Sequence, residues 1–193
     1  MATTPEDGGR LHPGSRAEWR AWLAAHHDAS DAVWLVLWRQ GSGRTGLTYE
    51  EAVLEALCFG WIDGRASGLD EERTMLRFSP RRRGSGWARS NKLRVERLLA
   101  EGLMAEPGLA RIEEAKRDGS WTRLDAVEDL VVPDDLADAL AAHPGAREYW
   151  DGLPRSVRRA ALLRIVEAKR PETRARWVAE TARLTARGER PAQ

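Results

Sequence analysis

The sequence has little cysteine, no long apolar run and few histidines, and each shortage excludes a class of protein. The single cysteine, Cys58, cannot form a disulfide within the chain, which is typical of a reducing compartment and predicts a cytoplasmic protein. No apolar run approaches the roughly 18 residues that a membrane-spanning helix requires. The first residues include acidic side chains and lack an apolar segment, so they are not typical of a secretory signal.

Motifs of several common enzyme classes are also missing. His26 and His27 are adjacent and cannot share one helix face, while His12 and His143 stand alone, so no metal site is predicted. The sequence contains no G-x-S-x-G elbow, no H-E-x-x-H pair and no P-loop. Cys58 has no histidine at a recognisable spacing and lies near the apolar stripe of a predicted helix, which is typical of a core residue. We therefore predict no cofactor and favour a non-catalytic protein, without excluding an enzyme.

The composition that remains is typical of a globular protein. Of the 193 residues, 42% are hydrophobic and 32% are charged. A chain of this length can form one core or two small lobes. We expect a disordered tail at residues 1–14, an α+β lobe at 15–120, a helical lobe at 121–188 and a frayed tail at 189–193.

Local signals give the expected fold class. Ser15–Glu18 and Thr48–Glu51 are predicted capping boxes, and each precedes an apolar stripe of helical spacing. Residues 33–38, VWLVLW, form a run too short for a helix, and residues 61–66 and 74–79 are predicted as two further strands. The predicted fold is helix-rich α+β: a small antiparallel sheet of about three strands packed with helices, followed by a helical C-terminal part.

Charge is strongly segregated, although the net charge is only +1. Residues 73–97 hold nine Lys or Arg and one acidic residue. Residues 121–151 hold two Lys or Arg and eight acidic residues, whereas residues 153–187 hold ten Lys or Arg and three acidic residues. Either the acidic segment packs beside the basic ones, or a basic face is exposed and attracts an anion or a nucleic acid. The sequence leaves both explanations open, and it leaves the oligomeric state open as well.

One glycine motif matches the dinucleotide-binding fingerprint in spacing. Gly41–Gly46 spells G-x-G-x-x-G between a predicted strand and a predicted helix, and Asp63 lies 17 residues beyond Gly46. In that fingerprint the helix opens within the glycines, whereas here the capping box places its start at Thr48. The sequence therefore favours a polar loop over a dinucleotide site.

The stretch from Gly60 to Asn91 is the preferred candidate site. Three guanidinium groups, a Gly-Ser-Gly turn and a helix start coincide near its end, a combination that favours an anion. Asp63 is a candidate ligand acceptor or general base, although such a residue more commonly forms a structural ion pair. A solvated basic loop is the alternative for the arginines. The candidate ligand-binding residues are Trp61, Asp63, Arg65, Arg81, Arg82, Ser85, Trp87 and Asn91, and no catalytic residue is assigned.

Several segments together resemble one bacterial family. They are LTYEEAVLEALCFGWIDGR, FSPRRRGSGWARSN, EGLM, IEEAKRDGSW, VPDDLADAL and LPRSVRRAALLRIVEAKRPETRARW, in that order. Over about residues 15–184 the chain resembles the YdeI/OmpD-associated proteins, also called bacteriocin-protection proteins. Ala88 departs from the pattern, because the family usually has a serine there, so Ser90 or Gly86 is expected to cap the following helix instead.

The resemblance implies a small cytosolic α+β protein involved in tolerance of envelope stress or bacteriocins, without an established catalytic activity. The family name also suggests association with an outer-membrane porin. The resulting hypothesis is a non-catalytic protein that binds a small anionic ligand or a protein partner. The alternative is nucleic-acid binding through residues 73–97 and 153–187, and an enzyme that uses Asp63 as a base is less favoured.

Overall fold

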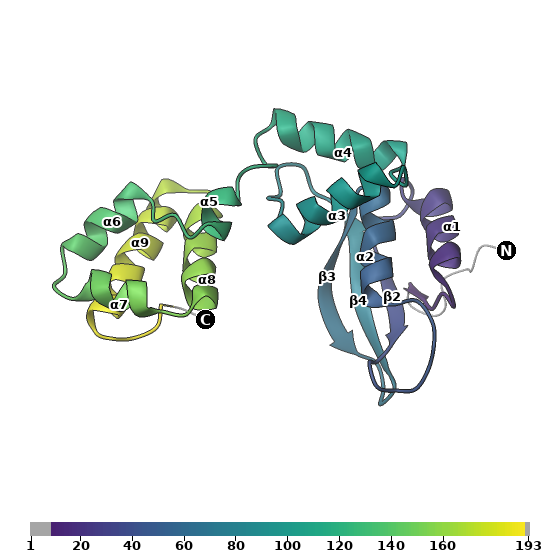
Figure 1. The fold of residues 1–193 in the computed structure, drawn as a ribbon, viewed down its shortest axis with the longest axis horizontal. Coiled ribbons are helices and arrows are strands. Elements are labelled where there is room, and N and C mark those ends of the chain that lie inside the picture. Colours follow the sequence, from purple (N-terminus) through teal and green to yellow (C-terminus); the bar gives the residue numbers. More distant parts are fainter. Residues whose placement is uncertain (1–8, 192–193) are drawn as a thin grey trace. The chain divides into compact units, whose positions relative to one another are not determined.

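The computed structural model describes residues 9–191 and divides into two compact units. We call residues 9–85 with 90–121 the sheet unit, and residues 86–89 with 122–191 the helical unit. Figure 1 colours most of the sheet unit purple to teal and most of the helical unit green to yellow. Two parts of the predicted tails, residues 1–8 and 192–193, lie outside the described residues.

The sheet unit contains a mixed sheet of four strands in the order β1-β2-β4-β3. Strand β1 pairs in parallel with β2, and the other pairs are antiparallel, so the α+β class and the three predicted antiparallel strands are confirmed. The assignment of residues 10 and 11 to a disordered tail is wrong, because they form β1. A strand of two residues has no alternation that a sequence pattern could reveal. The strands are β1 (Arg10–Leu11), β2 (Val33–Trp38), β3 (Trp61–Gly68) and β4 (Arg73–Pro80).

Helices α1 (Arg16–His26) and α2 (Tyr49–Cys58) pack together, and α2 also packs against β3. The capping box at Thr48 is complete, since its hydroxyl accepts from the Glu51 amide and the Glu51 carboxylate accepts from the Thr48 amide. The Ser15 hydroxyl caps α1, but Glu18 accepts from the amide of Gly14 rather than from that of Ser15. The predicted box at Ser15 is therefore only half formed.

Aromatic side chains dominate the core of the sheet unit. Trp19 stacks on Trp22 with ring centroids 5.3 Å apart and meets Phe78 edge-on at 5.5 Å. Trp61 meets Trp22 edge-on at 5.8 Å. These rings are buried, and such pairs add to the stability gained from burying their area.

Helices α3 (Arg89–Ala100) and α4 (Glu106–Arg117) follow the sheet. Helix α4 approaches the end of α2 so closely that a Cβ atom on Gly108 would lie 2.3 Å from the carbonyl oxygen of Cys58. Only glycine fits at that position without a shift of backbone.

The helical unit is built around its last helix, α9 (Pro171–Ala186), which packs against α6, α7 and α8. Its core is aliphatic apart from Trp150, and it includes Leu136, Leu140 and Ile165. Glu189 donates its amide to the carbonyl of Leu184 at 2.9 Å and Pro191 is buried, so the chain is packed, and not frayed, up to residue 191. The other helices of this unit are α5 (Asp125–Glu128), α6 (Asp134–Ala141), α7 (Ala146–Gly152) and α8 (Arg155–Val166).

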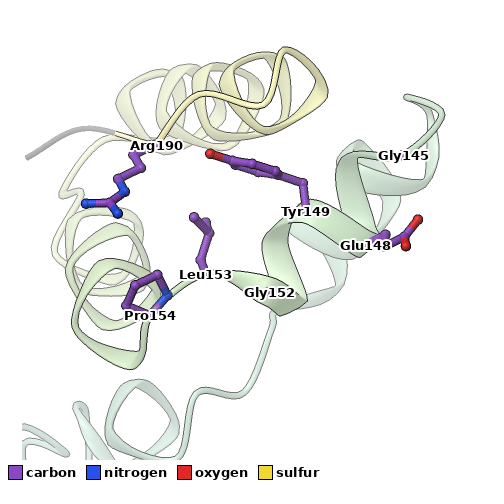
Figure 2. Close-up of a pocket in the computed structure, with 7 residues that line it drawn as sticks. All are labelled: Gly145, Glu148, Tyr149, Gly152, Leu153, Pro154 and Arg190. Atoms are coloured by element: carbon purple, nitrogen blue, oxygen red, sulfur yellow. The ribbon is translucent and has the colours of Figure 1, made fainter.

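A cavity of about 540 Å³ opens in the helical unit beside α7. Figure 2 shows Tyr149 and Arg190 projecting toward the same space above Leu153, whereas Glu148 points away from it. Of the residues that line it, only Tyr149 and Arg190 direct polar side-chain groups toward it, so we do not treat this cavity as the candidate site.

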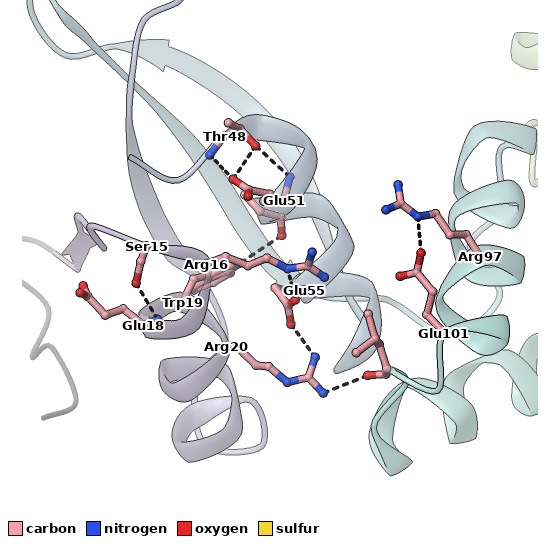
Figure 3. A network of polar contacts seen from close by, with 12 residues as sticks. Ser15, Arg16, Glu18, Trp19, Arg20, Thr48, Glu51, Glu55, Arg97 and Glu101 are labelled. Atoms are coloured by element: carbon pink, nitrogen blue, oxygen red, sulfur yellow. Dashed lines mark hydrogen bonds and ion pairs between the residues drawn. The ribbon is translucent and has the colours of Figure 1, made fainter. Parts of the chain in front are cut away.

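Buried charge holds the helices of the sheet unit together (Figure 3). Glu55 on α2 is 2% exposed and accepts from Arg16 at 2.5 Å and from Arg20 at 2.6 Å, both on α1. Arg20 also donates to the carbonyl of Leu103 at 2.9 Å. A buried carboxylate is tolerated only with such partners, so this network fixes α1 against α2. Burial and the neighbouring Glu55 raise the pKa of the Cys58 thiol, which suits an inert core cysteine.

Candidate functional site

Three of the residues predicted from the sequence contribute to one polar cluster in the sheet unit. Asp63 on β3 lies opposite Phe78 in the strand register, so its side chain is on the sheet face that α2 covers. The Tyr49 hydroxyl, at the start of α2, donates to Asp63 Oδ2 at 2.9 Å. Partial burial, followed by this bond to Asp63, raises the pKa of Tyr49, so the phenol stays protonated at neutral pH.

Arg81 lies just beyond β4 and is 6% exposed. Its amide donates to the carbonyl of Gly60 at 2.9 Å, which fixes the backbone after the strand. Burial lowers the pKa of Arg81 to about 10, and the charge of Asp63 partly opposes that shift. A guanidinium with this pKa is still charged at neutral pH, and the charge of Asp63 stabilises it.

Arg94 on α3 completes the cluster. Its Nε and Nη2 groups donate to the two carboxylate oxygens of Glu50 at 2.9 and 2.6 Å, and its Nη1 group donates to Asn91 Oδ1 at 3.0 Å. The bidentate bond lowers the pKa of Glu50, and the Asp63 charge acts on Arg94 as well. We call the set the Tyr49 cluster: Tyr49, Glu50, Asp63, Arg81, Asn91 and Arg94.

The other predicted site residues do not join this cluster. Trp61 lies in the core and donates its Nε1–H to the carbonyl of His27 at 3.1 Å. Arg65 and Arg82 are exposed, and the Ser85 hydroxyl donates back to the carbonyl of Arg82 at 2.8 Å, which closes a turn. Trp87 is buried, and its backbone belongs to the helical unit. A role for these five residues in ligand binding stays a prediction.

A groove of about 890 Å³ begins beside the Tyr49 cluster and is larger than the cavity beside α7. Its floor is apolar and comes from the sheet and the loop before α2, while Trp38 and Tyr49 are aromatic residues in its wall. Arg39, Arg44 and Glu50 are its charged residues. The groove is lined by Leu37, Trp38, Arg39, Gln40, Gly41, Arg44, Gly46, Leu47, Thr48, Tyr49, Glu50, Ala66, Thr74 and Leu76.

The electrostatics of the groove favour a negative ligand. Glu50 is neutralised by Arg94, whereas the Arg44 guanidinium lies 5.5 Å from the Trp38 ring and 3.7 Å from an exposed Glu72. Ion pairs between exposed side chains are weak, so Arg44 remains available to a ligand. Arg39 donates its Nε–H to the carbonyl of Arg73 at 3.2 Å, a bond that engages no acid.

The groove residues in the loop Gly41–Gly46 were not predicted as a site, although the G-x-G-x-x-G sequence of this loop was noted. The helix begins at Tyr49, after the last glycine, and β2 and β3 on either side of α2 are not neighbours in the sheet. A dinucleotide fingerprint requires a parallel β-α-β unit with the helix opening at the glycines. This loop therefore forms a groove wall and does not reproduce that fingerprint.

The segregated charges of the sequence are partly paired within the helical unit. Glu128 accepts from Arg159 at 2.7 Å, and Asp135 accepts from Arg174 at 2.7 Å. Asp129 accepts from Arg89 at 2.8 Å. Acidic residues of 121–151 thus pack beside basic residues of 153–187, which is the first of the two explanations for the charge pattern. Between residues 9 and 191, no group of three or more His, Cys, Asp or Glu is placed to hold a metal ion.

The mixed sheet with its helices and the separate helical unit define a small α+β protein. Residues 11–111, more than half of the chain, match the family model described as a domain of unknown function, DUF8412, and the chain belongs to that family. Residues 129–188 match the model described as bacteriocin-protection, YdeI or OmpD-associated, which confirms the resemblance read from the sequence over a narrower span.

Searches of curated proteins and of solved structures returned no match to the chain. Within the part that the structure describes, no helix is long and apolar enough to cross a membrane.

Proposed function

We propose that the protein is a non-catalytic binding protein that holds a small anionic ligand with an apolar or aromatic body in the groove of the sheet unit. One observation carries the proposal: an apolar floor, two aromatic residues and two arginines converge on a space of about 890 Å³. Pockets of this size with few convergent polar groups are the usual sites of small ligands.

The aromatic residues suit a flat apolar body. Tyr49 is 46% exposed although its hydroxyl is fixed by Asp63, so its ring is both accessible and held in place. The Arg44 guanidinium lies over the Trp38 ring, so a cation is positioned at the edge of the aromatic wall of the groove. A ligand that stacks on a ring and directs a carboxylate or phosphate to Arg44 satisfies both groups.

Asp63 has a positioning role in this proposal. It accepts from Tyr49 and lies near Arg81, so its charge is already engaged within the protein. A general base needs a proton acceptor that is directed at the substrate, and the Asp63 oxygen is directed at Tyr49. This arrangement supports binding over the enzyme hypothesis.

The proposal is tested by thermal unfolding of the full chain with a panel of aromatic carboxylates, aromatic phosphates and the matching uncharged compounds. A ligand at about 100 times its Kd stabilises by about 2.7 kcal/mol. We expect stabilisation by one anionic class, and its loss in Arg44→Gln but not in the matched variant Arg117→Gln, an exposed arginine of the same unit. An equal response in both variants, or none to any compound, contradicts the groove site and favours a protein partner.

We propose further that ligand binding takes place in the cytoplasm and serves bacteriocin tolerance; the description of the family that matches residues 129–188 supports the second point. Cells that express the chain are expected to survive bacteriocin exposure better than cells that express Arg44→Gln at the same level. Equal survival of the two populations argues against a role for the groove in tolerance.

A further inference from the structure

A second cavity, of about 450 Å³, lies in the helical unit where α8 ends and α9 begins. Its lining carries three cations and a single acid. Part of the lining comes from residues 168–174, AKRPETR, which lie in one of the segments that carry the family resemblance. It shares no residue with the groove of the sheet unit. The cavity is lined by Arg164, Glu167, Ala168, Lys169, Arg170, Thr173 and Trp177.

The three cations of this cavity have no acidic partner among the described residues. Within residues 9–191, no carboxylate lies within 4.0 Å of Arg164, Lys169 or Arg170, whereas Arg159 and Arg174 on the same two helices are paired with Glu128 and Asp135. The three cations where α8 ends and α9 begins are therefore not neutralised by an ion pair within that range. An uncompensated group of three cations attracts anions.

Trp177 holds one of these cations in place. The Arg164 guanidinium lies over the Trp177 ring at 3.1 Å from its centroid, and the Arg176 guanidinium lies over the same ring at 4.3 Å. A guanidinium stacked on an aromatic face keeps its N–H donors in the plane of the group and free for an acceptor. Arg164 is thus oriented without an acid, and its donors remain for a ligand.

The backbone at the start of α9 adds hydrogen-bond donors and partial positive charge. Helix α9 starts at Pro171, and its N-cap residue, Arg170, supplies no side-chain acceptor to the first amides. The first turn of a helix carries unpaired N–H groups and partial positive charge. The Thr173 hydroxyl in the cavity lining can donate as well.

We infer that this cavity is a phosphate-binding site, which takes the phosphate group of a small phosphorylated molecule. Arg164, held in place on the Trp177 ring, offers planar donors, and Lys169 and Arg170 supply charge. The inference does not depend on the groove, because the two sites lie in different units and share no residue.

The test is isothermal titration calorimetry of the full chain with inorganic phosphate and with phenyl phosphate. Lys169 and Arg170 are exposed, so the double variant Lys169→Gln/Arg170→Gln is expected to fold, and circular dichroism checks that it does. The matched control is Arg187→Gln/Arg190→Gln, which removes the same charge from exposed positions outside the cavity. Loss of charge-assisted hydrogen bonds is expected to raise the Kd for both probes by about tenfold or more in the first variant only.

Three results with the two phosphate probes, titrated also against Arg44→Gln, would overturn the inference. They are no binding of either probe, an equal loss of affinity in the two double variants, and binding that depends only on Arg44. A single-stranded oligonucleotide is titrated in parallel at several salt concentrations. If it binds far more tightly than phenyl phosphate and both double variants weaken it equally, the basic face is a nucleic-acid surface and not a phosphate pocket.

Discussion

The two units differ in how deeply they bury charge. The sheet unit has exposed ion pairs, but it also buries two charged side chains: Glu55 is 2% exposed between two arginines, and Arg81 is 6% exposed near Asp63. The helical unit keeps its ion pairs nearer the surface, as Asp135 with Arg174 shows. Buried pairs are costly to break and exposed pairs contribute little, so the same kind of substitution should have different consequences in the two units.

The largest expected effect is that of Glu55→Ala. Removing the buried carboxylate leaves Arg16 and Arg20 without their acid and opens a cavity beside α1, so the sheet unit should lose about 3 kcal/mol of stability. The matched variant is Asp135→Ala, whose pair with Arg174 is exposed, and it should cost the helical unit about 0.5 kcal/mol.

Hydrogen exchange with mass spectrometry measures both variants, because it reports the stability of each unit separately. Equal losses in the two units would contradict the contrast between buried and surface charge.

A second contrast concerns two glycines. Gly108→Ala forces a Cβ atom against the carbonyl of Cys58, so α4 must move and the sheet unit should lose about 1–3 kcal/mol. A Cβ atom on Gly152 meets no atom within 4 Å, and Gly152→Ala is expected to change the stability of the helical unit by less than about 0.5 kcal/mol. Urea unfolding of the two variants checks this, and a larger loss in Gly152→Ala would refute the packing account.

A third prediction concerns the hydroxyl group of Tyr49. Tyr49→Phe removes the hydrogen bond to Asp63 and should cost about 1 kcal/mol near neutral pH. The folded-state pKa of Tyr49 is raised above its unfolded value of about 10, so its contribution is complete below that pH and is lost as the pH rises through the folded-state pKa.

Stability measured between neutral and strongly alkaline pH distinguishes the two proteins. We expect the wild type to lose more stability than Tyr49→Phe as the pH rises above about 10. Parallel curves would show that the hydroxyl does not stabilise the folded state.

Signals that act within one element were predictable from the sequence. The capping box at Thr48 and the run VWLVLW identified α2 and β2, because caps and apolar periodicity depend on neighbouring residues. The same reasoning missed β1, whose two residues are defined only by their partner in β2.

The candidate site was only partly predictable. Asp63 was selected for its charge, but its partner Tyr49 lies on a helix 14 residues earlier and was not selected as a site residue. The groove combines β2, β3, β4, the loop and α2, so it exists only once the strand register is known. Trp87 was grouped with Arg81 by proximity in sequence, yet its backbone belongs to the other unit.

The most direct test of the central claim is an NMR titration of the full chain with 2-naphthoate, which carries an aromatic body and a carboxylate. The indole N–H signals are assigned by Trp38→Phe and Trp177→Phe, and Arg44→Gln serves as the site variant. The account predicts saturable shifts at Trp38 that disappear in Arg44→Gln while Trp177 is unaffected. Shifts confined to Trp177, or shifts at Trp38 that persist in Arg44→Gln, would contradict a ligand site in the groove.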